Sequence, residues 1–154
     1  MALSQMSKQC ILTALLVFVN SLYYVTVCYD EFSVIEALRD KENDKDSWSN
    51  PDKLMAKLKS DTTINFIYFM AAIILVPIFI VGVVKRNIPS MIPLLLLLPI
   101  YYIYNQEMFY SEKRWIPMYL TMITTTALLA NPVRVVFSEI IEEKKTVRKL
   151  YSGK

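Results

Sequence analysis

Four long stretches without charge, separated by charged stretches, are the dominant pattern along this chain. The charge-free windows are residues 9–29, 62–84, 87–106 and 115–133, with 21, 23, 20 and 19 residues. A bilayer core of about 30 Å is crossed by roughly 20 mostly apolar residues in a helix. Backbone groups in lipid have to bond within their own segment, which favours helices. The pattern predicts an all-α integral membrane fold, a bundle of four transmembrane helices.

The segment between the first two windows, residues 30–61, is predicted to form the longest loop. Its first part, Glu31–Leu38, is expected to extend the first helix by a turn or two. A helix-start signature then follows, because Asn50 can cap, Pro51 suits the first helical position and Asp52 favours the positive end of the helix dipole. The short helix that begins there either packs on the span ends or lies on the membrane surface.

The other connections are short. The pair Lys85-Arg86 separates the second and third windows, so these two spans have to lie side by side and antiparallel. Three prolines in the third window predict that this span is the most kinked; they are Pro89, Pro93 and Pro99. Residues 134–154 are expected to continue the fourth helix as a charged, amphipathic tail. The whole chain, 1–154, is then one membrane domain.

The first window has a rival interpretation, a cleaved signal peptide. Its apolar run is long, only Lys8 precedes it as a positive charge, and no Ala-x-Ala site follows. These features favour a retained span over a cleaved one.

Composition and charge also predict how the chain is oriented in the membrane. The chain is 55% hydrophobic and carries a net charge of +3, with a mean hydropathy of +0.35. Segment 30–61 holds nine acids and six bases, whereas 134–154 holds six bases and three acids. The number of Lys and Arg residues is nearly the same on the two predicted sides of the membrane. The compact Lys85-Arg86 turn and the basic tail favour cytosolic termini. As a lipid-headgroup contact this pair is an ordinary feature.

The aromatic residues are distributed unevenly. Of ten tyrosines, only Tyr151 lies away from the predicted outer side. An interfacial belt is one explanation, because amphipathic rings suit the headgroup layer. The alternatives are a surface for a partner or a packed outer lid.

Candidate chemistry is sparse. No window contains an ionisable acid or base, and the chain has no histidine, which excludes a His-based triad or zinc site. Four threonines of the last window either line a polar path or bond between helices; they are Thr121, Thr124, Thr125 and Thr126. We therefore predict no catalytic residue, no metal ligand and no cofactor, and expect that the chain is not an enzyme and binds no nucleic acid.

The two cysteines lie at opposite ends of the first window. Cys10 and Cys28 are about 27 Å apart if the window is one helix, which excludes a disulfide between them. Cys10 is either a plain buried or interfacial thiol or a palmitoylation site near the cytosolic face.

Two short segments resemble known families. The segment Ile80-Val-Gly-Val-Val-Lys85-Arg86-Asn87-Ile-Pro89 resembles the second hairpin of small arthropod four-span proteins, which are similar to lysosome-associated transmembrane proteins and to insect septate-junction tetraspans. The segment Asn105-Gln-Glu107-Met108-Phe109 resembles part of the jagunal family of endoplasmic-reticulum proteins. The resemblance implies a plasma-membrane or endomembrane location, lysosomal or in the endoplasmic reticulum.

These features favour a non-enzymatic function. We expect a membrane organiser, or a trafficking or junction accessory subunit, whose partners are the lipid bilayer and other membrane proteins bound through the spans and the outer aromatic face. The alternative is a small channel or transporter, with the third and fourth spans lining its path.

Overall fold

Four helices make up nearly all of the described chain. The computed structural model describes residues 3–42, 51–104 and 116–152, and contains no strand in these ranges. The helices are α1 (Gln5–Glu42), α2 (Pro51–Val84), α3 (Ile88–Tyr104) and α5 (Ile116–Ser152). The all-α prediction is therefore confirmed. The segment resembling the jagunal family lies outside the described residues.

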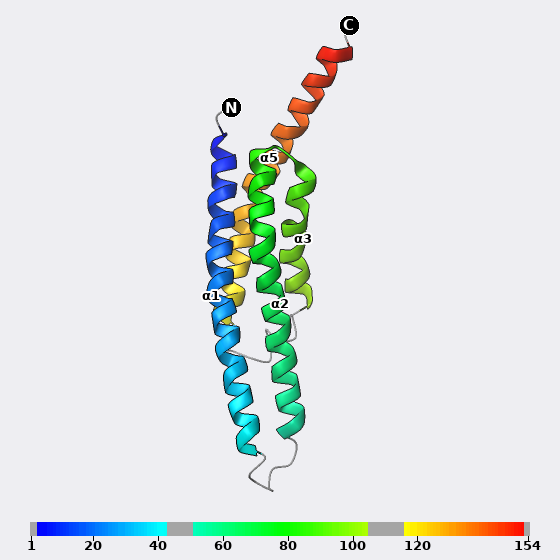
Figure 1. The fold of residues 1–154 in the computed structure, drawn as a ribbon. Coiled ribbons are helices and arrows are strands. Elements are labelled where there is room, and N and C mark those ends of the chain that lie inside the picture. The colour runs from blue at the N-terminus through cyan, green and yellow to red at the C-terminus, as the bar shows by residue number, and fades with distance from the viewer. Residues whose placement is uncertain (1–2, 43–50, 105–115, 153–154) are drawn as a thin grey trace.

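The helices run side by side as an up-and-down bundle (Figure 1). α1 packs on α2 and α5, and α3 packs on α2 and more lightly on α5. The N-terminus and the α2–α3 turn lie at one end of the bundle, which we call the turn end. We call the opposite end, where α3 finishes at Tyr104, the aromatic end.

Three of the helices are long and apolar enough to cross a membrane. They contain the segments Gln5–Leu38, Met55–Val84 and Ile116–Tyr151, while α3 provides a shorter apolar helix, Ile88–Tyr101. α3 has 17 residues and is about 25 Å long at 1.5 Å per residue. It remains one helix through Pro93 and Pro99, and the predicted kink stays a prediction.

Large apolar side chains point outward along the bundle as well as inward. Those at least half exposed on the three long helices and α3 include Leu12, Val19, Ile67, Ile74, Leu96, Ile100, Leu120 and Leu128. A soluble protein rarely leaves an apolar surface of this extent in water. The outward-facing apolar side chains therefore agree with a membrane-embedded protein.

Helices extend beyond the bundle at both ends (Figure 1). α1 continues to Glu42 and α2 begins at Pro51, so residues 30–42 and 51–61 are helical. The predicted extension of the first helix over Glu31–Leu38 is confirmed and runs on to Glu42, and the short helix predicted from Pro51 is the first part of α2. The helix start at Pro51 is confirmed. α5 runs on through the predicted tail to Ser152. The long α1 extension is stabilised by apolar side chains such as Ile35, which is buried, and Phe32, whose ring packs edge-on against Phe66 of α2.

The bundle core is filled with apolar side chains. Its largest fully buried members come from α2, α3 and α5 and include Phe79, Met91, Leu94, Met118, Leu129 and Ile140. Burial of this kind contributes roughly 0.8 kcal/mol per CH₂ in water, whereas between helices in lipid close van der Waals packing is the main term. The interior is therefore a packed core.

Candidate functional site

The turn between α2 and α3 is a tight helix cap. Arg86 adopts a left-handed backbone conformation with φ of 52°. The amide of Asn87 donates to the carbonyl of Gly82 at 2.8 Å, and that of Arg86 to Val83 at 3.4 Å. This pair of bonds is the Schellman motif, which usually places glycine at the left-handed position. An arginine at this position indicates that its side chain has a role that offsets the backbone strain.

Gly82 allows α2 and α3 to approach closely beside this turn. A Cβ atom at Gly82 would lie 2.9 Å from Cγ of Met91 and 3.1 Å from the carbonyl oxygen of Asn87. Both distances are shorter than an ordinary contact between non-bonded atoms. The close packing of α3 on α2 therefore requires glycine here.

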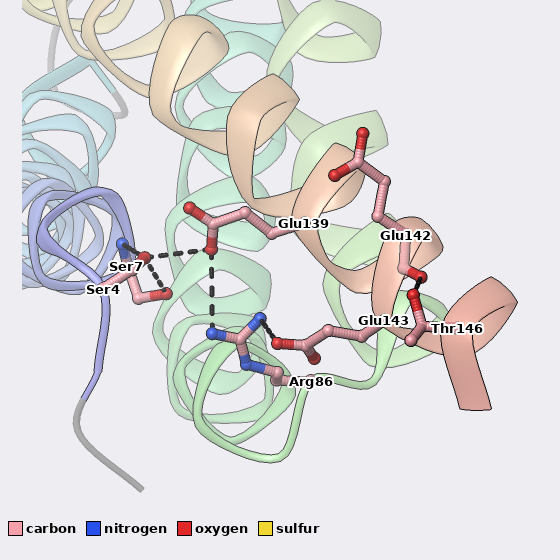
Figure 2. A network of polar contacts seen from close by, with 7 residues as sticks. All are labelled: Ser4, Ser7, Arg86, Glu139, Glu142, Glu143 and Thr146. Atoms are coloured by element: carbon pink, nitrogen blue, oxygen red, sulfur yellow. Dashed lines mark hydrogen bonds and ion pairs between the residues drawn. The ribbon is translucent and has the colours of Figure 1, made fainter. Parts of the chain in front are cut away.

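The Arg86 side chain joins the turn to α5. Its Nη2 atom lies 3.7 Å from Oε2 of Glu139, and its Nη1 atom lies 2.8 Å from Oε1 of Glu143. Ser4, just before α1, donates to the same Oε2 atom of Glu139 at 3.0 Å. We call these four residues the turn cluster (Figure 2). It links the start of the chain, the α2–α3 turn and α5 at one point.

The turn cluster is partly exposed, which limits its energy. The side chains of Arg86, Glu139 and Glu143 are 21%, 32% and 44% exposed. Ion pairs of this kind contribute about 0.2–1 kcal/mol each. The cluster is better suited to fixing the direction in which α5 leaves the bundle than to stabilising the whole fold.

Beyond Glu143, α5 continues as an exposed helix to Ser152. We call residues 144–152 the α5 arm, which projects past the turn end in Figure 1. Its side chains from Lys144 to Tyr151 are exposed, including the large apolar side chains of Val147, Leu150 and Tyr151. The arm thus combines basic and apolar side chains that nothing in the described chain covers.

At the aromatic end, several rings are packed inside the bundle. Tyr68 stacks on Tyr101 with ring centroids 3.7 Å apart, and Tyr24 stacks on Phe69 at 5.1 Å. Tyr68, Phe69 and Tyr101 are all at most 6% exposed. For these three residues the packed lid is therefore correct and the lipid-facing belt is wrong. Tyr23 and Tyr29, in contrast, are exposed, as an interfacial belt requires.

A buried polar pair anchors this packed lid. The hydroxyl of Tyr101 donates to Oδ1 of Asn65, which is fully buried, and it also lies 3.8 Å from the sulfur of Met118. A turn further out, buried Thr62 donates to a carboxylate oxygen of Glu31 at 3.1 Å. The pattern of the sequence gives no indication of these pairings.

The threonines of α5 bond to their own helix. Thr121, Thr124 and Thr126 donate to the carbonyl one turn earlier, at 2.7–2.8 Å, and Thr125 donates to Thr121 at 2.9 Å. Such intrahelical bonds satisfy the hydroxyl groups without a neighbouring helix. These hydroxyl groups therefore bond within α5, which is neither of the two alternatives that the sequence suggested.

A lateral groove opens where α3 and α5 pack most lightly. It has a volume of about 380 Å³, and its lining is nearly all apolar. The lining residues come from both helices and are Leu98, Pro99, Tyr101, Met122, Ile123, Thr126, Ala127 and Ala130. A second void, of about 20 Å³, lies inside the bundle beside Asn20, Ser21 and Thr125. That volume suits about one water molecule.

The two cysteines are free thiols, and both side chains are 0% exposed. The exclusion of a disulfide is confirmed. Burial of Cys10 favours the plain buried thiol over palmitoylation, because an acyl group needs access to the sulfur. In the described part of the chain, no three residues of the types His, Cys, Asp and Glu are gathered as a metal site would need.

Sequence reasoning treated Lys85 and Arg86 alike, and the structure separates them. Lys85 is exposed, whereas Arg86 turns toward α5. The four-residue spacing of Glu139 and Glu143 places both carboxylates on one helix face. This spacing is the feature of the sequence that indicates a shared cation. Which cation faces them depends on tertiary packing. Comparison of the chain with protein-family models, with curated proteins and with solved structures finds no match.

Proposed function

We propose that this chain is a four-span membrane protein that acts as an accessory subunit or organiser of another membrane protein. α3 is the fourth span in this proposal. Its 17 residues are fewer than the roughly 20 that cross an average bilayer, but a short span is accommodated by local thinning of the bilayer. Its position beside α2 and α5, which have apolar outer faces, supports this assignment.

The charge at the turn end supports cytosolic termini. The described residues at this end include eight bases and three acids; the bases are Lys8, Lys85, Arg86, Arg134, Lys144, Lys145, Arg148 and Lys149, and the acids are Glu139, Glu142 and Glu143. Segment 30–61 at the other end is net acidic. The numbers of Lys and Arg at the two ends nearly tie, so the support for a cytosolic turn end comes from the compact Lys85-Arg86 turn and the basic end of α5, which lie next to the spans.

The observation that carries the proposal is the closed, apolar interior beside an open lateral groove. A channel or transporter needs a polar route through the bundle or ionisable groups within it. The described core is mostly apolar, its few buried polar side chains are single Ser, Thr and Asn residues without charge, and the void beside three of its polar side chains holds about 20 Å³. This geometry favours binding at the side of the bundle over transport through it.

The lateral groove is the proposed site for a span of the partner protein. Ala127 and Ala130 on its floor are small, and small residues let helix backbones approach closely in membranes. The aromatic face that the sequence suggested as a contact surface is less suitable, because three of its described rings, Tyr68, Phe69 and Tyr101, are buried in the bundle. By resemblance, lysosomal, junctional and endoplasmic-reticulum membranes are the proposed locations.

Affinity purification from cells in a mild detergent tests this function. We expect the intact chain to retain the same membrane protein in repeated purifications, and Ala130→Phe, which fills the groove, to lose most of it. Leu128→Phe is the matched control, since Leu128 is exposed on α5 but does not line the groove. A chain that purifies alone, or conducts ions in sealed vesicles, would refute the proposal.

A further inference from the structure

Three of the four basic residues of the α5 arm lie on the side of α5 opposite to Glu143, facing away from the turn. Glu143 points to Arg86, with 2.8 Å between the charged atoms. Lys145 follows two residues later, about 200° further around the helix at 3.6 residues per turn. Arg148 and Lys149 lie three and four residues beyond Lys145 and therefore share its face. All three side chains are exposed.

This basic face continues the lipid-facing face of α5. Arg134 precedes Lys145 by eleven residues, and Ile123 precedes Arg134 by another eleven, which is close to three helical turns each time. Ile123 is 43% exposed, and Arg134 is also exposed. One stripe thus passes from an apolar outer side chain near mid-helix to basic side chains at the turn end.

These side chains lie close to the level of the α2–α3 turn. Glu143 is level with the α2–α3 turn, because it contacts Arg86 there. Lys144 follows at once, and Lys149 is only about 9 Å further along the helix than Glu143 at 1.5 Å per residue. Headgroups of the surrounding leaflet lie within reach of long, flexible Lys and Arg side chains.

Arg86 also removes most of the competing negative charge. Among the described residues of the turn end the acids are Glu139, Glu142 and Glu143, and Arg86 contacts two of them. Glu142 is the one acid among these three that Arg86 does not contact, and the described residues of that end include seven bases besides Arg86. The outward face of the arm consequently has a strongly positive potential.

We propose that the basic face of the α5 arm binds the headgroups of anionic phospholipids in the leaflet at the turn end. The positive charge of this face favours an anionic ligand. Because the face is aligned with the lipid-facing stripe of α5, we infer that this ligand is the membrane surface and not an acidic protein. Basic residues next to a transmembrane helix attract anionic lipid in this way. This inference rests on the membrane-embedded bundle of the proposed function, and it needs no partner protein.

Lipid titration of the purified full chain tests the inference. The chain in a neutral detergent is titrated with phosphatidylserine or phosphatidylcholine, and bound lipid is counted by native mass spectrometry. We expect phosphatidylserine to bind more tightly, with an affinity that falls as salt is added. The variant Lys145→Gln/Lys149→Gln should lose roughly fivefold in affinity for each base removed.

The matched control is Lys57→Gln/Lys59→Gln. These two lysines are exposed on the extension of α2 at the aromatic end, and their loss should leave phosphatidylserine binding unchanged. Equal binding of the two lipids, or an equal loss in both double variants, would overturn the inference. So would binding of polyglutamate by the wild-type chain with no preference for phosphatidylserine, which would identify an acidic protein as the ligand. A failure here leaves the groove proposal intact, because that experiment measures a retained protein.

Discussion

At Arg86, backbone strain lowers the stability of the fold, whereas the ion pairs of the side chain raise it. Arg86 is left-handed, with φ of 52°, and a non-glycine residue in this conformation costs about 1–2 kcal/mol. Its two ion pairs with Glu139 and Glu143 are partly exposed and contribute about 0.2–1 kcal/mol each. Replacing Arg86 by alanine removes the ion pairs and retains the strain. Replacing it by glycine removes both.

We therefore expect Arg86→Ala to lower the free energy of unfolding by about 1 kcal/mol. Arg86→Gly should be close to the wild type, because relief of strain offsets the lost ion pairs. The measurement is unfolding of the purified chain by sodium dodecyl sulfate in mixed micelles, followed by circular dichroism. Variants have to be compared in one detergent mixture, since the denatured state differs between mixtures.

A double-mutant cycle separates the ion pair from the strain. Glu143→Gln combined with Arg86→Ala should cost no more than Arg86→Ala alone, because both changes remove the same contact. Arg86→Gly less stable than Arg86→Ala would refute the left-handed turn. Additive effects of Arg86→Ala and Glu143→Gln would refute the contact between the two side chains.

Three further substitutions test packing and polar groups by the same unfolding measurement. Gly82→Val should destabilise by about 1–3 kcal/mol through overpacking, because a Cβ would lie 2.9 Å from Cγ of Met91; a neutral effect would contradict the close α2–α3 contact. Tyr101→Phe keeps the ring stack on Tyr68 and removes the bond to Asn65, for which we expect a loss of about 0.6–1.7 kcal/mol, and no loss would contradict that bond. Thr124→Val should change stability by less than about 0.5 kcal/mol, since this exposed hydroxyl donates to the carbonyl of Leu120 in its own helix; a large loss would indicate a bond to another helix.

The pattern of charges was enough to predict the helices of the bundle. Charge-free windows of about 20 residues allow little except membrane helices, and the capping residues at Asn50-Pro51 indicated where α2 begins. The length of the extensions was underestimated. The stretch after Asp30 contains many charges, but Phe32 packs on Phe66 of α2 and Ile35 is buried, which favours a helix there.

The contacts of the candidate site could not be predicted from the sequence, because they depend on how the helices pack. Tyr68 and Tyr101 look like interfacial tyrosines by position, and only the packing of α2 on α3 shows that they stack in the core. Lys85 and Arg86 are equivalent in a charge count. Their separation into an exposed cation and a partner of Glu143 depends on the left-handed backbone at Arg86.

The central claim is that α3 crosses the membrane together with the three longer helices. Cysteine labelling in sealed vesicles with a membrane-impermeant maleimide tests it most directly, using Lys57→Cys, Lys85→Cys and Lys145→Cys in separate chains. The native Cys10 and Cys28 are 0% exposed and should react little. If α3 spans the bilayer, Lys145→Cys is labelled on the same side as Lys85→Cys and opposite to Lys57→Cys. Labelling of Lys145→Cys on the side of Lys57→Cys would contradict the claim, because α5 would then begin where α2 ends.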